Sequence, residues 1–324
     1  MEGLQKKHKI QCQSLAKRLH SSPAWNNLLK FQNLNGLYFD ILSEHHYWFV
    51  LTLLCYQFSM YGNAIDHICF NTSTEENFPL FAHKVKAAIA AGMSWVAVDQ
   101  KTDLVVGFTM SHDVLVANSF KSAPNPLASP FQQLQKQINS KALQSMPHLS
   151  NLIFDENLKL SLQQHLFILF YFFLGIKYGE IGVYGVVTLA SEFVDQKLGQ
   201  LLGLLQLTTY CHLDYRMGFT INASPESHQL TFGGTRTFFP YKLFDFSRLK
   251  FPEGNKCKSM DDVYLELHTK HGYTKEYVDY VKRNSQVMIT YIIFRGPEWW
   301  LGYANVFPYF KHVIQETFPH FTKL

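Results

Sequence analysis

The chain has few of the features that mark secreted, zinc-binding or disulfide-stabilised proteins. Its 324 residues include five cysteines, an odd number, and no Cys-x-x-Cys pair. Neither a disulfide framework nor a metal site is therefore indicated. The N-terminal segment also has no apolar run of the kind found in secretory signal peptides. We therefore expect a protein of the reducing cytoplasm, with no bound metal.

Long apolar runs are missing as well. The most lipid-like segment, Leu166–Ile176, has only eleven residues, which is too short to span a bilayer. We interpret it as the end of a buried helix over about residues 155–176, and a segment lying on a membrane surface is the alternative. The sequence thus predicts no membrane span.

Charge of one sign is also scarce. The formal net charge is +4, and 17% of the residues are charged. The densest basic cluster, Lys6–Lys9, lies near the N-terminus, where a solvated helix face explains it. So mild an excess gives no support to a nucleic-acid partner.

Apolar and aromatic residues, by contrast, are abundant. Hydrophobic residues make up 47% of the chain and aromatic residues 15%, which is enough for a large core. Their periodicity and the turn signals between them predict an α+β fold with a mixed, mostly antiparallel sheet flanked by helices. Helices are expected at about 1–30, 44–58, 80–91 and 155–176, from 199 and from 224, and strands at 36–42, 94–98, 104–110, 186–189, 217–223, 238–246 and 263–268.

The most informative segment is Gly185–Leu205. An apolar stretch typical of a strand, Val186–Leu189, meets the polar turn Glu192–Lys197, and a leucine-rich helical pattern begins near Gly199. A strand that runs through a tight turn into a helix presents free backbone N–H groups to an anion. This arrangement suits a pyrophosphate, although glycine is sparse in the turn.

Three stretches in this order resemble the GNAT superfamily of N-acetyltransferases, and within it the invertebrate arylalkylamine N-acetyltransferase-like branch. They are residues 91–108, with a Val-Ala-Val-Asp hairpin, residues 185–205, and residues 217–230, with Gly-Phe followed by Ala-Ser-x-x-Ser. The resemblance implies a GNAT-like domain over residues 31–270. An N-terminal helical extension, 1–30, would precede it, and a C-terminal extension, 271–324, would pack on it.

The resemblance also implies acetyl-CoA as cosubstrate. Residues Val194–Gly199 align with the family's pyrophosphate pattern Gln/Arg-x-x-Gly-x-Gly/Ala, in which Gly199 matches the second glycine. Lys197 then stands at the first glycine and Val194 at the opening position, whereas a second register would begin at Gln196. The residues expected to bind the cosubstrate are Leu189, Ala190, Val194, Asp195, Gln196, Lys197, Leu198, Gly199 and Gln200.

The general base is less clearly indicated. Where the related branch has a glutamate after its first helix, this chain has Asn63, which cannot accept a proton. Asp66, three residues further on, is the carboxylate that could serve. Other candidates are a water chain or a histidine, namely His45, His46, His67 or His112.

Two serines match those that the related branch places near substrate and thiol. Ser227 lies inside an expected helix and could orient the amine or protonate the departing thiolate. Ser224 has the same two roles open to it, but capping of that helix explains it equally well. The tyrosine that supplies an acid in many relatives has no counterpart in residues 230–235.

The sequence therefore predicts an acetyl-CoA-dependent N-acetyltransferase that transfers an acetyl group directly to a small amine, with arylalkylamines as one candidate class. The alternative is a catalytically degenerate protein of GNAT fold that binds CoA or a partner without turnover. Three departures favour that alternative: Asn63 in place of the glutamate, Lys197 in place of the first glycine, and the missing tyrosine in residues 230–235.

Overall fold

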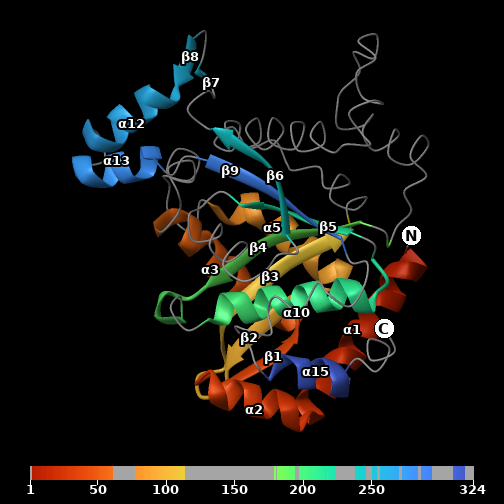
Figure 1. The fold of residues 1–324 in the computed structure, drawn as a ribbon. Coiled ribbons are helices and arrows are strands. Elements are labelled where there is room, and N and C mark those ends of the chain that lie inside the picture. Colours follow the sequence, from red (N-terminus) through yellow and green to blue (C-terminus); the bar gives the residue numbers. More distant parts are fainter. Residues whose placement is uncertain are drawn as a thin grey trace, which may run out of the picture.

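The main feature of the structure is one seven-stranded sheet. The computed structural model describes residues 2–60, 77–113, 179, 181–193, 197–215, 217–222, 238–245, 250–253, 256–269, 272–283, 286–293 and 309–317. The sheet has the order β1 (Leu37–Ile41), β2 (Trp95–Asp99), β3 (Leu104–Asp113), β4 (Ile181–Leu189), β5 (Met217–Asn222), β9 (Gln286–Ile293) and β6 (Phe238–Asp245) (Figure 1).

Only one neighbouring pair in this sheet is parallel. β4 runs parallel to β5, whereas β1–β2, β2–β3, β3–β4, β5–β9 and β6–β9 are antiparallel. A parallel pair needs a crossover connection, and α10 (Leu198–His212) lies in the connection between these two strands. The predicted α+β class with a mixed, mostly antiparallel sheet is confirmed.

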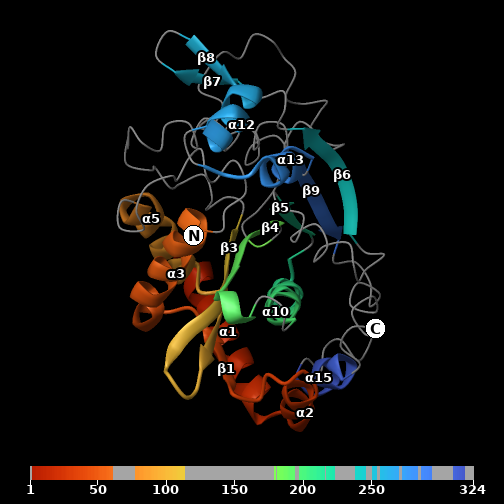
Figure 2. The same cartoon turned by 90° about the vertical axis from the view of Figure 1, so that its left-hand side faces the viewer.

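Helices cover both faces of the sheet. Figure 2 shows α3 (Tyr47–Met60) and α5 (Phe78–Ala91) on one side of β1 to β3 and α10 on the other. Three further helices pack on the α10 side, namely α1 (Glu2–Ser21), α2 (Pro23–Phe31) and α15 (Phe310–Thr317). Strand residues alternate accordingly, because Trp95 and Ala97 contact the α10 layer while Val96 and Val98 contact the α3 layer.

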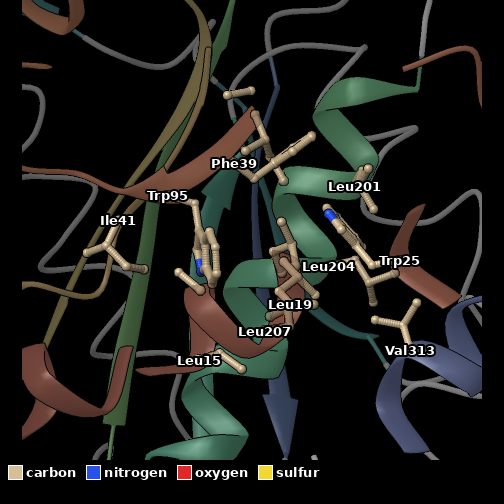
Figure 3. Packing of buried hydrophobic residues seen from close by; sticks show 14 of the residues in the cluster. Leu15, Leu19, Trp25, Phe39, Ile41, Trp95, Leu201, Leu204, Leu207 and Val313 are labelled. Carbon is tan, nitrogen blue, oxygen red and sulfur yellow. The ribbon is translucent and has the colours of Figure 1, made fainter. Parts of the chain in front are cut away.

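The core on the α10 side unites distant parts of the chain. Leu15 and Leu19 of α1, Trp25 of α2 and Val313 of α15 meet the leucines of α10 above the sheet (Figure 3). The ring of Trp25 packs edge-to-face on Phe39 of β1, with centroids 5.2 Å apart. The expected N-terminal helical segment is therefore part of the main core.

Local signals explain several helix ends. Ser22 caps α2 by accepting a hydrogen bond from the Trp25 N–H at 3.1 Å, and Glu316 of α15 accepts from the Ser22 hydroxyl at 2.6 Å. Helix α5 ends where Gly92 adopts the left-handed conformation, with φ of 67°. A Cβ at Gly92 would lie 2.7 Å from Cβ of Lys9, so this position also lets α1 approach closely.

The strand predicted at 263–268 is wrong. These residues lie in α12 (Met260–Thr269), which a capping box starts: the Ser259 hydroxyl accepts from the Asp262 N–H at 3.2 Å, and the Asp262 carboxylate accepts from the Ser259 N–H at 2.8 Å. The alternating apolar pattern of the segment suggested a strand, while the serine three residues before an acid was the stronger signal.

The described residues between β6 and β9 form a hairpin and two helices, and Tyr264 and Val278 of these helices belong to the same core cluster as α3 and α5. The hairpin β7 (Lys250–Glu253) and β8 (Lys256–Ser259) precedes α12 and α13 (Lys275–Arg283), as Figure 1 shows. The chain then returns to the sheet as β9, which lies between β5 and β6. The segment expected as a C-terminal extension thus supplies an inner strand of the main sheet.

Two predicted helices, over 155–176 and from 224, lie outside the described residues, as does the apolar run Leu166–Ile176. None of the helices in the described ranges combines the length and the apolar character that crossing a bilayer requires.

Candidate functional site

The two parallel strands in the middle of the sheet pair over only part of their length. Pairing runs from Ile181 opposite Met217 to Tyr184 opposite Thr220. Beyond Tyr184, β4 continues to Leu189 beside β3, and β5 continues to Asn222 beside β9. Over the described residues, the second half of β4 therefore turns an edge toward β5 without pairing with it.

A bulge marks the point where the pairing ends. Ser111 of β3 lies opposite Tyr184 and Met110 lies opposite Val186, so Gly185 is the extra residue in β4. A bulge bends and twists the strand that carries it. The second half of β4 thus leaves the direction of the first half at Gly185.

The backbone groups of this second half face in alternate directions. The Ala190 N–H donates to the Val106 carbonyl of β3 at 2.8 Å. In an antiparallel ladder the intervening residues face the other way, so the peptide groups of Val187 and Leu189 face the β5 side. The Leu189 carbonyl there accepts a hydrogen bond from Nε2 of Gln57 in α3 at 2.6 Å.

A short turn joins the end of β4 to α10. The Phe193 N–H donates to the Ala190 carbonyl at 3.0 Å and closes the 3-10 turn Ser191–Phe193. After residues 194–196, which lie outside the description, Lys197 stands directly before α10 with φ of 57° and ψ of 6°. Its side chain is exposed.

The left-handed backbone at Lys197 is unusual for its residue type. Four non-glycine residues in the described ranges have positive φ, and the other three are Asn33, Asp103 and Asp214. Asn and Asp tolerate this conformation, whereas glycine adopts it at least cost. When Val194–Gly199 is aligned with the family pattern, Lys197 stands at the first glycine. The left-handed backbone at this position explains why the pattern has a glycine there.

The start of α10 presents backbone donors. The first helical hydrogen bond runs from the Leu201 N–H to the Lys197 carbonyl at 3.0 Å, so the N–H groups of residues 198–200 have no partner within the helix. In the described part of the chain no side chain caps this end, and the first turn has no acid. The positive end of the helix dipole adds to these donors, and together they suit an anion.

Glycine at position 107 brings the helix start close to the strand end. A Cβ there would lie 2.9 Å from Leu189, 3.0 Å from Leu202 and 3.3 Å from Leu198. Leu198 and Gly199 are buried, and the buried side-chain oxygen of Gln200 has no hydrogen-bond partner among the described residues. The first turn of α10 therefore offers an unsatisfied acceptor beside the backbone donors.

Buried polar contacts fix α10 on the sheet. Nε1 of Trp95 donates to the Thr209 hydroxyl at 2.7 Å, and the Thr109 hydroxyl donates to Gln206 at 2.8 Å. The Tyr210 hydroxyl donates to the Val183 carbonyl of β4 at 2.7 Å. Since buried hydrogen bonds are directional, these contacts set the rotation and height of α10 against β2, β3 and β4.

The predicted cosubstrate residues that the structure describes lie at one place. Leu189 ends β4 and Ala190 follows it, while Lys197 precedes α10 and residues 198–200 form its first turn. The other predicted site residues lie outside the described ranges, namely Val194, Asp195, Gln196, Asp66, Ser224 and Ser227. Their roles remain predictions.

The histidine candidates differ in their surroundings. His46 is buried, its Nδ1 accepts from the Ser43 N–H at 3.2 Å, and burial lowers its pKa. This contact caps the turn Glu44–His46 that contains His45, so His46 has a structural role. His67 lies outside the described residues.

His112 of β3 lies cross-strand from Val183 of β4. Burial, with a smaller effect of the Lys84 ammonium of α5, lowers the pKa of His112 to about 4. Burial also lowers the pKa of Lys84 to about 8. The imidazole of His112 is therefore neutral at pH 7, and it is a weak acceptor for the proton of an ammonium group.

Sequence reasoning missed Gln57. The helix Tyr47–Met60 contains no charged residue, and Gln57 is its one long polar side chain. Such an isolated polar residue in an apolar helix was the available signal, but its partner is 132 positions away. Among the residues that the structure places, no three His, Cys, Asp or Glu side chains converge as a metal site would require.

No protein-family model and no curated protein sequence matches the chain. Several solved structures do. Mosquito arylalkylamine N-acetyltransferase-like 5b superposes with a TM-score of 0.51 at 9% identity, over 79% of this chain and 99% of that chain. The C-terminal condensation domain of Ebony, in complex with beta-alanyl-dopamine, gives 0.49 at 11% identity over 79% and 98% of the two chains. Arylalkylamine N-acetyltransferase 2 of Aedes aegypti gives 0.46 at 12% identity over 81% and 100%.

Identities this low bear on the fold alone, and the superposition on arylalkylamine N-acetyltransferase-like 5b is the one that supports it. That superposition covers 79% of this chain. Together with the mostly antiparallel sheet and its one parallel pair, it confirms the expected α+β architecture. The chain has a GNAT-like fold, similar to that of mosquito arylalkylamine N-acetyltransferase-like 5b.

Proposed function

We propose that this protein is an acetyl-CoA-dependent N-acetyltransferase that acts on a small amine. The observation that carries the proposal is the separation of β4 from β5 after Tyr184, together with the start of α10, which no described side chain caps. The separated strand offers a peptide edge to an extended ligand, and the helix start offers positive potential to its phosphates. The fold shared with a mosquito arylalkylamine N-acetyltransferase-like protein supports the same assignment.

The residues at this place fit the chemical parts of acetyl-CoA. The amide-containing arm would lie along the Val187 and Leu189 edge of β4, and the unsatisfied oxygen of Gln200 would accept from a ligand N–H. The diphosphate would face the N–H groups of residues 198–200 and the Lys197 ammonium, which acts as a point charge. Val194, Asp195 and Gln196 complete the proposed turn.

The bound cosubstrate supplies an acetyl group activated as a thioester. The reaction then requires a neutral amine, because the amine nitrogen forms the new bond to the carbonyl carbon while the carbon–sulfur bond breaks. We propose Asp66 as the group that takes the amine proton, and Ser227, with Ser224 second, as the hydroxyl that orients the amine or protonates the leaving thiolate. Burial lowers the pKa of His112 to about 4, so His112 is no more basic than an ordinary carboxylate.

The direct test is isothermal titration with acetyl-CoA and CoA, followed by a turnover assay on a panel of amines that begins with arylalkylamines. We expect binding of both ligands and release of free thiol with at least one amine. Binding without turnover would favour the degenerate alternative. No binding at millimolar concentration would refute the proposed enzyme and leave only a degenerate protein that binds a partner.

A further inference from the structure

Gln57 joins two layers of the molecule at the end of β4. It lies on α3, on one face of the sheet, and its amide donates to the Leu189 carbonyl at 2.6 Å. Leu189 is the last residue of β4, and the turn that follows leads to α10 on the opposite face. The contact therefore ties one helical layer to the point where the chain leaves the sheet for the other.

The peptide unit between Leu189 and Ala190 is held from both sides. Gln57 binds its carbonyl, and its N–H donates to the Val106 carbonyl of β3 at 2.8 Å. The next carbonyl, that of Ala190, accepts from the Phe193 N–H at 3.0 Å and closes the turn. With both ends of one peptide bound, its plane is fixed, and so is the direction in which the turn departs.

We propose that Gln57 is a positioning residue for the diphosphate of the acyl donor. It acts through the turn: by fixing the Leu189–Ala190 peptide, it sets where the turn Ser191–Phe193 lies relative to the β4 edge, and with it the direction of the chain toward the first N–H groups of α10. This inference rests on the proposed function and extends it to a residue that does not contact the diphosphate. Without the Gln57 bond, only the β3 side of the peptide remains bound.

The test compares two substitutions at Gln57 with one at Gln100. Gln57→Met keeps the length of the side chain and removes the donor, and Gln57→Glu keeps the shape but cannot donate at neutral pH. Gln100→Met is the matched control, because the Gln100 amide also donates to a backbone carbonyl, that of Leu37, at 3.4 Å, away from the turn. Each protein is titrated with CoA and with pantetheine, which lacks the diphosphate.

We expect both Gln57 variants to bind CoA about two- to tenfold more weakly, as the loss of one hydrogen bond predicts, with a smaller change for pantetheine. Gln100→Met should bind both ligands like the wild type. Hydrogen exchange without ligand gives an independent readout: amides of residues 190–193 should exchange faster in Gln57→Met and unchanged in Gln100→Met.

Three results would overturn the inference. Unchanged CoA affinity in Gln57→Met would remove it and leave the proposed function intact. An equal loss for CoA and pantetheine would show that Gln57 acts on the arm rather than through the turn. Failure of the wild type to bind either ligand would remove the proposed function and this inference together.

Discussion

The two halves of β4 share one strand but have different surroundings. The first half, residues 181–184, pairs with β3 and β5 and is held by Tyr210 of α10. In the described parts of the chain, the second half, after the bulge at Gly185, pairs only with β3, and Gln57 binds the end of its other edge. The comparison teaches that the first half is anchored to the core, whereas the second half carries the backbone groups that we propose the cosubstrate contacts.

The largest effect should come from crowding the first half. A Cβ at Gly182 would lie 2.4 Å from the ring of Tyr210, so Gly182→Ala must displace that ring. We expect the free energy of unfolding to fall by about 1–3 kcal/mol in urea denaturation. Gly36→Ala is the control, because its Cβ would meet nothing within 4 Å. Equal stability of the two variants would contradict the tight contact.

Acid should lower the free energy of unfolding through His112, which lies beside the first half of β4. His112 faces Val183 across the ladder, and its pKa is lowered to about 4 from 6.5, so the unfolded chain binds more protons than the folded chain between these values. Stability should therefore fall as the pH drops from about 6.5 to 4, by up to about 3 kcal/mol. His112→Gln should flatten this part of the profile of unfolding free energy against pH. An unchanged slope would show that other groups cause the acid sensitivity.

Reversal of the charge at Lys197 should lower CoA affinity without lowering the stability of the fold. Lys197→Glu places a carboxylate at the helix start, where we propose the diphosphate, and we expect CoA affinity to fall roughly tenfold or more in calorimetry. Lys17→Glu changes an exposed lysine of α1 by the same charge and should leave the affinity nearly unchanged. An equal loss in both variants would indicate only long-range attraction.

Removal of the Tyr210 hydroxyl should lower the stability of the protein but not its affinity for CoA. Tyr210→Phe deletes the donor to the Val183 carbonyl and should lower the free energy of unfolding by about 1 kcal/mol. CoA affinity should stay within twofold, because this bond lies in the first half of β4. A large loss of affinity with unchanged stability would reverse the roles assigned to the two halves.

The smallest effect concerns backbone strain at Lys197. Lys197→Gly relieves the left-handed conformation, with φ of 57°, and should raise the free energy of unfolding by up to about 1 kcal/mol. The same change removes the ammonium, so CoA affinity should fall modestly. A destabilised variant would argue that the lysine side chain supports the turn.

Local sequence signals predicted much of this arrangement. The stop of α5 at Gly92, the hairpin of β2 and β3, and the strand–turn–helix of residues 185–205 each depend on neighbouring residues, and all three are present. That local pattern was enough to bring Leu189, Ala190 and residues 197–200 together. The left-handed Lys197 was not predicted, because lysine carries no signal for positive φ.

Long-range features could not be predicted in the same way. The place of β9 between β5 and β6 depends on pairing between segments some seventy residues apart along the chain, such as Met217 with Ile293. The partner of Gln57 depends on how α3 packs on the sheet, which periodicity does not determine. The proposed base, Asp66, and the two serines stay predictions, since no described contact involves them.

Hydrogen exchange of the protein with and without CoA tests the central claim most directly. If the second half of β4 and the start of α10 hold the cosubstrate, CoA should slow exchange in residues 186–201 and leave residues 181–184 unchanged. Protection that is absent from 186–201, or that appears equally in both halves of β4, would contradict the account.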